Sequence, residues 1–437
     1  MKPQRRLAAL LLATAVWAGP ALAETIAIVG GTVATVANPV PMANATILIE
    51  NGRIRAVGTS VAVPPGATVI DATGKIVTPG IIAGMSYIGL SEVNAVDETN
   101  EVRAPKSPFS AGLDLAPGIN AAASNIAVER QGGITRAVVG PIASHEIFGG
   151  MGAVVTLAAG PDIVERPRAF EYVELGEAGA EAAGGSRPAA WANFRNALKE
   201  AERLARSPAA YADGRDKEAI IPRLDVEALV PVIRGTMPLV VHVERASDIL
   251  NVLKIRDEFA KVRLILLGAN EGWLVADKIA AAHVPVVTMP MVDLPASFET
   301  LASTKSNVGR MVAAGVVVGL GITAQDASFQ ARDLPNYAGN LVAQARVPGG
   351  VGLTQAQALA VLTRNPATIF GLTDTGTIEV GKRADIVVWD GDPLELESAP
   401  VAVLIDGVRQ PMTSRQTDLR DRYLHLPHAD LPLQYRR

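Results

Sequence analysis

Residues 77–87 read Val-Thr-Pro-Gly-Ile-Ile-Ala-Gly-Met-Ser-Tyr, and this stretch divides the chain into two kinds of sequence. Pro79-Gly80 marks a turn, because proline fixes φ and glycine accepts φ values that other residues avoid. The sequence before the turn is rich in β-branched residues. After the turn, short apolar runs alternate with helical patterns. The turn therefore predicts the boundary between a β domain and a mixed α/β domain.

Both ends of the chain predict β-strands. Asn51-Gly52 joins two β-branched runs and predicts a tight hairpin, because both turn positions favour positive φ. Asp406-Gly407 has the same place near the other end. We therefore expect residues 24–79 and 372–413 to form one small β-sandwich domain. The expected strands are residues 26–29, 46–50, 53–57, 384–389, 402–405 and 408–409.

The middle of the chain, residues 80–371, predicts a (β/α)8 TIM-like barrel of the α/β class. Helical periodicity covers residues 188–205 and 353–362, with Pro188 at a first helical position and Thr354 as N-cap. An insertion is expected near residues 165–217. Residues 414–437 read as a polar C-terminal tail. Six of the eight strands are expected, one entered at Pro79-Gly80 and five at residues 134–139, 239–243, 262–267, 284–288 and 316–320.

Composition and the N-terminus predict an exported globular protein. Apolar residues make up 49% of 437, the formal net charge is −4, and no basic block favours nucleic acid as a partner. Met1–Ala23 has a charged start, an apolar run and a small-x-small cleavage site, so it reads as a signal peptide. We expect a periplasmic or secreted protein with no membrane span after cleavage. The chain has no cysteine, which excludes disulfides and thiol catalysis.

Several segments together resemble the amidohydrolase superfamily, closest to its imidazolonepropionase-like branch. The most specific is residues 375–393, TGTIEVGKRADIVVWDGDP, which resembles the return from barrel to β domain in that family. Pro79-Gly80, residues 238–249 and residues 315–321 are similar to the entry to the first barrel strand, to the fifth strand and to the eighth. The resemblance implies a metal-dependent hydrolase of carbon–nitrogen bonds. It places the active site at the C-terminal mouth of the barrel.

The metal ligands of that superfamily are mostly replaced here. Its first strand carries Asp-x-His-x-His, where this chain has Ala83, Met85 and Tyr87. The fifth-strand histidine falls at His242. The sixth-strand histidine falls at Gly268 and the eighth-strand aspartate near Thr323, while no fourth-strand Lys or Glu can be placed. Catalytic zinc sites use three protein ligands. We therefore predict no metal-binding residues and no cofactor, although the family normally binds one or two Zn²⁺ or similar ions.

The residues left at the expected mouth supply the candidate site. For catalysis we predict His242 as general base, with Arg332 or Tyr87 as the electrophile. Met85 is expected to fill the former metal pocket. Each candidate also fits a purely structural role, so both interpretations stay open. The predicted substrate-binding residues are His145, Glu146, Met85, Glu244, Glu271 and Asp326.

Two hypotheses about function remain. One is a periplasmic hydrolase of cyclic-amide or other non-peptide carbon–nitrogen bonds, with lost or altered activity because of the replaced ligands. The other is a non-catalytic protein that binds a small molecule in the barrel mouth or pairs with an intact paralogue. Either hypothesis allows a hetero- or homo-oligomer.

Overall fold

The computed structural model describes residues 25–209, 217, 219–322 and 329–424. The expected signal peptide, Thr323 and Asp326 lie outside the described residues, as does much of the expected C-terminal tail. Within residues 414–424 the tail forms helix α13 (Arg415–Leu424).

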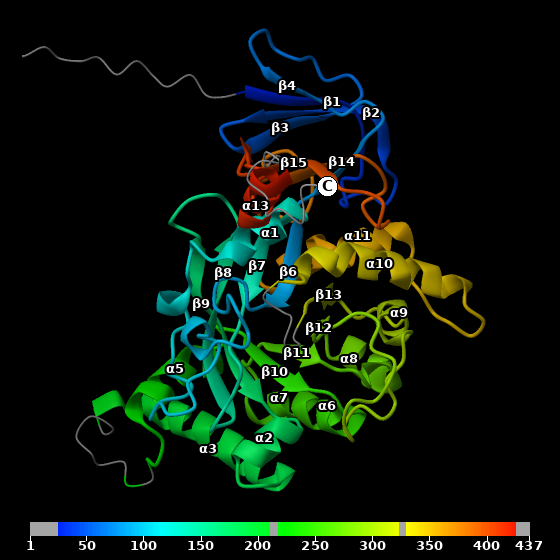
Figure 1. The fold of residues 1–437 in the computed structure, drawn as a ribbon. Coiled ribbons are helices and arrows are strands. Elements are labelled where there is room, and N and C mark those ends of the chain that lie inside the picture. Colours follow the sequence, from blue (N-terminus) through cyan, green and yellow to red (C-terminus); the bar gives the residue numbers. More distant parts are fainter. Residues whose placement is uncertain (1–24, 210–216, 218, 323–328, 425–437) are drawn as a thin grey trace, which may run out of the picture.

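A β domain built from both ends of the chain sits at one end of the molecule (Figure 1). Hydrogen bonds connect its eight strands in a single sheet, in the order β16-β15-β14-β5-β1-β2-β3, with β4 beside β1. The strands are β1 (Thr25–Val33), β2 (Met42–Glu50), β3 (Arg53–Gly58), β4 (Thr68–Asp71), β5 (Ile76–Pro79), β14 (Ile386–Trp389), β15 (Pro400–Ile405) and β16 (Val408–Arg409).

The two predicted hairpins close as the sequence expects. Asn51 and Gly52 have φ values of 52° and 75°, and Glu50 pairs with Arg53 across the turn. Asp406 and Gly407 repeat this geometry with φ values of 52° and 74°. Both turns need positive φ at two successive positions, which Asn-Gly and Asp-Gly supply at the least cost.

The second sheet is a nearly closed eight-stranded barrel with the order β13-β12-β11-β10-β9-β8-β7-β6. Ile322 N donates to Met85 O and brings the two ends of this sheet together. Seven strands run in one direction, and β8 is antiparallel to both of its neighbours. The strands are β6 (Ile81–Ser86), β7 (Ile134–Val139), β8 (Phe148–Thr156), β9 (Val164–Glu174), β10 (Leu239–Val243), β11 (Leu264–Gly268), β12 (Val286–Thr288) and β13 (Val318–Leu320).

Two barrel strands fall in segments where the sequence predicts none. Residues 148–152 begin β8, where the glycines let the strand approach its neighbours closely. The expected insertion near residues 165–217 includes β9, which is the fourth barrel strand in chain order. The start of β9 is charged, with Glu165, Arg166 and Arg168. A search for continuous apolar runs therefore does not find this strand.

Helices cover the outside of the barrel (Figure 1). Helix α3 buries Phe194, Leu198 and Leu204 on one face, as its periodicity predicts. Thr354 forms a capping box with Gln357 at the start of α11, which satisfies the free amides of the first turn. The helices are α1 (Ser124–Gln131), α2 (Glu177–Ala182), α3 (Arg187–Arg206), α5 (Arg223–Ile233), α6 (Ala246–Leu253), α7 (Ile255–Glu258), α8 (Ala276–Ala281), α9 (Asn307–Ala313), α10 (Leu334–Ala343), α11 (Gln355–Leu362) and α12 (Arg364–Ile369), with short 3₁₀ turns η1 (Asp97–Thr99), η2 (Ala116–Gly118), η3 (Gly272–Val275), η4 (Ala331–Asp333) and η5 (Gln344–Arg346).

Apolar side chains fill the inside of the barrel, and we call this cluster the barrel plug. Every second residue of a strand faces inward. On β9 and β10 the inward series begins with Phe170 and Val240 and continues toward the strands' C-terminal ends. The plug consists mainly of Ile82, Met85, Val138, Val154, Phe170, Tyr172, Val240, Ile265, Leu267, Val287, Ile369 and Phe370.

A buried guanidinium joins the barrel to the β domain. The Arg136 side chain, on β7, is fully buried. Its Nε and Nη2 donate to the two oxygens of Glu165 on β9 at 2.8 and 2.9 Å. The same guanidinium donates to Asp385 and Asp406 of the β domain. Arg383 also binds Glu165 and Asp406. We call these five residues the junction cluster.

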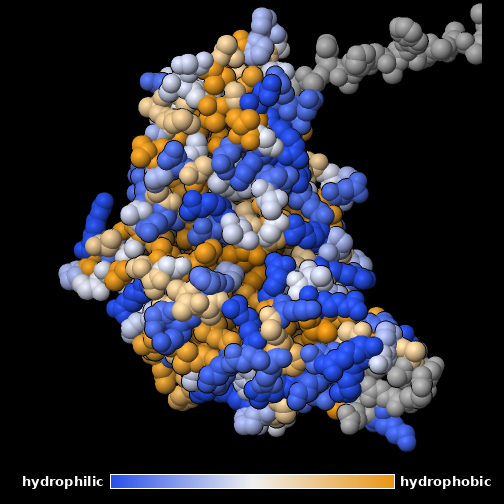
Figure 2. Space-filling model, turned by 180° about the vertical axis from the view of Figure 1, so that it is seen from behind, coloured by the Kyte–Doolittle hydropathy of each residue, from blue (hydrophilic) through white to orange (hydrophobic). Residues whose placement is uncertain are grey.

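The described helices include none that is both long and apolar enough to cross a membrane. The face of the molecule opposite to Figure 1 shows hydrophobic and hydrophilic residues interspersed, with several small hydrophobic areas (Figure 2).

One buried carboxyl group in the barrel wall yields a stability prediction. Glu171, on β9, is fully buried, and neither of its carboxyl oxygens has a hydrogen-bond partner. Burial, reinforced by the nearby Asp225, raises the pKa of Glu171 well above its usual value. The folded protein therefore retains a proton that the unfolded chain releases above its ordinary pKa, so the free energy of unfolding falls as pH rises. We expect Glu171→Met to raise the stability by about 1–3 kcal/mol at pH 8, and by less at pH 5.

Glu200 gives a matched control for this change. It is equally buried, but its carboxylate accepts from Asn196 Nδ2 at 2.9 Å and from Ile220 N at 3.1 Å. Glu200→Met leaves these donors unpaired and should lower the stability. Urea unfolding of both variants at pH 5 and pH 8 measures the two effects. A Glu171→Met protein that loses stability at pH 8 would contradict the prediction.

Candidate functional site

The barrel brings a carboxylate and an imidazole together at the ends of two adjacent strands. Glu174 is the last residue of β9 and pairs in register with His242 near the end of β10. His242 Nδ1 lies 2.6 Å from Glu174 Oε2, a length typical of a charge-assisted hydrogen bond. Gly176 N donates to Glu174 Oε1 at 2.9 Å and fixes the carboxylate. The pair lies at the C-terminal mouth, where barrel enzymes place their chemistry.

A second carboxylate binds the other imidazole nitrogen. His242 Nε2 lies 3.2 Å from Glu244 Oε1, and Asn270 N donates to Glu244 Oε2 at 2.8 Å. The imidazole is thus held between two carboxylates, and 21% of its side chain remains exposed. We call Glu174, His242 and Glu244 the mouth triad.

The two carboxylates decide the charge of His242. Burial by itself would lower the pKa of His242, but Glu174 and Glu244, through charge and hydrogen bonds, outweigh it and raise the pKa well above 6.5. The imidazole is therefore protonated at neutral pH, and both nitrogens donate. A protonated imidazole can act as a general acid, whereas the predicted role of general base requires the neutral ring.

Two phenols lie beside the triad and stay neutral. Tyr172 OH donates to Glu174 Oε2 at 3.2 Å. Burial, together with the charge of Glu174, raises the pKa of Tyr172 and also that of Tyr87 above the usual value. Tyr87 follows β6 and is 8% exposed. Both hydroxyls therefore keep their protons over the physiological range.

An acidic rim continues from the triad. A Cβ at Gly176 would lie within 3.0 Å of carboxylate oxygens of both Glu174 and Glu299, so these two groups face the same glycine. Glu299 accepts from Glu177 N and from Arg187 Nη2, at 2.7 and 2.9 Å. Burial raises the pKa of Glu299. Arg187 thus supplies positive charge at the edge of an acidic mouth.

Glycines lie at, or pack against, positions where the resemblance places metal ligands. A Cβ at Gly268 would lie 2.5 Å from Glu244 Oε1, and Gly268 has a φ of 85°. The space of a sixth-strand side chain is therefore taken by Glu244. Met85 belongs to the barrel plug, and a Cβ at Gly140 would lie 2.6 Å from its sulfur. The backbone of Gly321 also lies against Met85.

Two other predicted residues have structural partners. Arg332 is not brought together with His242, because it binds the buried Glu129 of α1 through its backbone N and through Nη1. α1 ends just before β7 begins, on the side of the barrel away from the mouth. Glu271 accepts from Ala246 N at 3.0 Å and Ala302 N at 3.1 Å, so it holds two mouth loops.

The loop after β7 holds the remaining described candidates. His145 Nδ1 lies 3.4 Å from Ser144 Oγ, and Glu146 is exposed. Their place after β7 puts this loop on the mouth side of the barrel. Asp326 lies outside the described residues.

Four residues at the mouth do not stand out in the sequence, namely Tyr172, Glu174, Arg187 and Glu299. Glu174 could have been found only by recognising β9 as the fourth strand, where the resemblance expects a Lys or Glu. The inward series Phe170, Tyr172 and Glu174, with a spacing of two, is the signal that identifies this strand.

The described donor set does not fit the metal site of the family. Among the residues that the structure describes, no group of three or more His, Asp and Glu side chains is arranged to hold a metal ion. Both nitrogens of His242 already bind carboxylates. The apolar side chain of Met85 packs inside the barrel and offers no oxygen or nitrogen ligand.

Comparisons with known proteins agree with this architecture. Residues 271–409 match the model of the Amidohydrolase family. A crystal structure of an amidohydrolase from Thermotoga maritima MSB8 superposes with a TM-score of 0.78 at 25% identity, over 88% of this chain and 99% of that one. The family-model match and this superposition together support the amidohydrolase superfamily for this chain.

Two curated amidohydrolase-superfamily proteins are also similar in sequence. The amidohydrolase tasK of Hapsidospora irregularis is 27% identical over 401 residues, which cover 83% of this chain and 39% of that protein. An imidazolonepropionase of Sphingopyxis alaskensis is 53% identical over 47 residues, 10% of this chain and 12% of that protein. The chain thus spans less than half the length of these curated relatives.

Substitution of Gly268 tests how tightly the mouth of the barrel is packed. We expect Gly268→Ala to lower stability by about 2–4 kcal/mol, because positive φ strains any Cβ and this one also collides with Glu244. Gly315→Ala is the matched control, with a φ of 90° but no neighbour within 4 Å, and should cost about 1 kcal/mol. Equal losses in thermal unfolding would contradict the collision.

Proposed function

We propose that the protein hydrolyses carbon–nitrogen bonds of amides, including cyclic amides, at the mouth triad. The observation that carries this proposal is the 2.6 Å contact between His242 Nδ1 and Glu174 Oε2 at adjacent strand ends of an amidohydrolase-type barrel. A partly buried, oriented imidazolium at a barrel mouth is a catalytic arrangement that packing alone does not require. The imidazolonepropionase-like branch and the replaced metal site are parts of the same proposal.

The proposed chemistry uses the triad as an acid–base pair. Glu244 accepts a proton from water while the water oxygen bonds to the carbonyl carbon. His242 Nε2–H then protonates the leaving nitrogen as the C–N bond breaks, and the proton held by Glu244 passes to the imidazole across their 3.2 Å contact. Glu174 holds the ring and stabilises its positive charge. Tyr87, a neutral phenol, is the proposed donor to the carbonyl oxygen.

A second candidate function is non-catalytic binding of a small molecule or an intact paralogue. Both imidazole nitrogens are already bound to carboxylates, and Met85 packs into the barrel plug, which favours a site that recognises rather than reacts. For either function we propose a periplasmic or secreted location, based on residues 1–23, and a small molecule at the mouth.

The purified mature chain distinguishes the two functions. It is incubated with N-acyl amino acids, dipeptides and cyclic imides, with and without added Zn²⁺, and products are measured by mass spectrometry. Turnover that His242→Gln abolishes supports the hydrolase. Absence of turnover across the panel, or turnover unchanged in His242→Gln, overturns it. Near-stoichiometric Zn, Fe or Mn in protein purified without chelator would overturn the metal-independent mechanism.

A further inference from the structure

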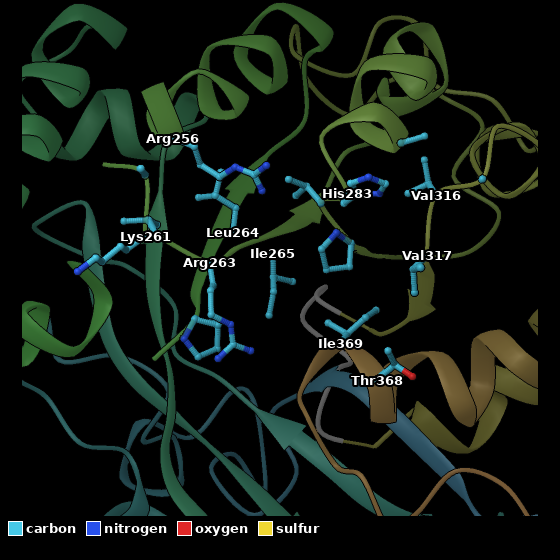
Figure 3. Close-up of a pocket in the computed structure, with 17 residues that line it drawn as sticks. Arg256, Lys261, Arg263, Leu264, Ile265, His283, Val316, Val317, Thr368 and Ile369 are labelled. Carbon is cyan, nitrogen blue, oxygen red and sulfur yellow. The ribbon is translucent and has the colours of Figure 1, made fainter. Parts of the chain in front are cut away.

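A cavity of about 610 Å³ lies at the end of the barrel opposite to the mouth triad. Its walls are the residues just before β10, β12 and β13, residues 260–265 leading into β11, residues of α7 and α8, and Thr368 and Ile369 of α12 (Figure 3). Ile265 and Ile369 belong both to this wall and to the barrel plug, so the plug separates the cavity from the mouth. We call it the basal cavity. Its size is that of a small-molecule site.

The charges around the basal cavity have one sign. Arg256, Lys261 and Arg263 line it together with His283, and none of its 17 lining residues is Asp or Glu. The whole chain has a formal net charge of −4, so the positive charge around this cavity is opposite in sign to that of the protein as a whole. Lys261 and Arg263 are exposed, and neither forms a salt bridge within the described residues. Their charges therefore remain available to a ligand.

Two features hold polar side chains in defined positions on the cavity wall. Arg256 Nη2 donates to Ala282 O at 2.9 Å, which fixes this guanidinium beside the cavity and leaves its other N–H groups for a ligand. His283 ends the turn after α8 with a φ of 51°, in the left-handed region where glycine is the usual residue. An imidazole is thus placed on the wall despite an unfavourable backbone conformation (Figure 3).

We propose that the basal cavity binds a small molecule with two or more anionic groups. Guanidinium groups match carboxylate and phosphate oxygens through paired N–H donors, and lysine adds a mobile point charge. A concave site of this volume accommodates a compact polyanion and excludes a polymer that needs a long groove. The ligand class is defined by charge and size, and this proposal is independent of the activity at the mouth.

The test uses pyrophosphate and citrate as separate probes, titrated into the purified full chain by calorimetry at low ionic strength. We expect saturable binding of at least one probe, and the stronger of the two identifies phosphate or carboxylate as the preferred group. Arg263→Gln and Lys261→Gln should each weaken it about tenfold, the loss of one charge-assisted hydrogen bond. His242→Gln, in the mouth, should bind normally.

Two matched variants keep the result interpretable. Lys199→Gln removes an exposed positive charge from α3, outside the cavity, and should leave affinity within twofold. His283→Gly relieves the positive φ, so its unfolding temperature should stay equal or rise while probe affinity falls. Absence of binding by both probes overturns the proposal. An equal loss of probe affinity in Lys199→Gln and Arg263→Gln also overturns it, because non-specific charge attraction would then account for the heat of binding.

Discussion

Replacement of Arg136 by methionine is expected to lower the stability of the whole protein by about 3–5 kcal/mol, because it leaves the buried Asp385 carboxylate without its counter-charge. Arg136 is fully buried and binds Glu165 of the barrel together with Asp385 and Asp406 of the β domain. Methionine keeps much of the side-chain volume, so the creation of a cavity does not explain the effect. Urea unfolding, followed by tryptophan fluorescence, measures it.

The control is an exposed pair elsewhere in the barrel. Arg168 binds Asp114 at 2.7 Å, but 62% of the arginine side chain is exposed. Arg168→Met should therefore cost at most about 1 kcal/mol. The double change Arg136→Met with Asp385→Leu should recover part of the loss, since it removes an unpaired buried charge as well. Equal losses for Arg136→Met and Arg168→Met would contradict the role of the junction cluster.

The junction cluster explains why the segment TGTIEVGKRADIVVWDGDP is so informative. Arg383 and Asp385 stand in its centre, and both charges belong to the cluster. The sequence therefore predicts the return from barrel to β domain, because the ion pairs that hold the two domains use residues of one short motif. The hairpins are equally predictable, since Asn51-Gly52 and Asp406-Gly407 satisfy a local backbone requirement.

The candidate site is less predictable because it depends on register between distant strands. His242 is recognisable from its own strand, but its two partners are not equally visible. Glu244 lies two residues along the chain, whereas Glu174 is 68 residues away on a strand with a charged start. Arg332 is equally hard to place from the sequence, for the same reason. Its partner, the buried Glu129, is 203 residues distant, and nothing in the local sequence predicts that pairing.

Glu174→Gln is expected to have the largest effect on function, a loss of about 100-fold or more in turnover of any amide substrate. Glu174 is the nearer carboxylate of the mouth triad, and its charge and hydrogen bond both raise the pKa of His242. The amide removes the charge, so the pKa of His242 falls and less imidazolium is present at neutral pH. The Glu side chain and its replacement have nearly the same shape, which limits other changes.

The protonation state gives a readout that does not depend on the substrate. In the unaltered protein, NMR of the His242 ring should show an imidazolium throughout pH 6–7.5, and Glu174→Gln should bring its titration into or below this range. Because the folded-state pKa is raised, the stability from this pair is complete below pH 6.5 and is lost as pH rises through the folded pKa. Glu271→Gln is the control, since its carboxylate binds Ala246 N and Ala302 N rather than His242. A His242 ring that titrates near 6.5 in the unaltered protein would exclude the charged triad and with it the proposed acid.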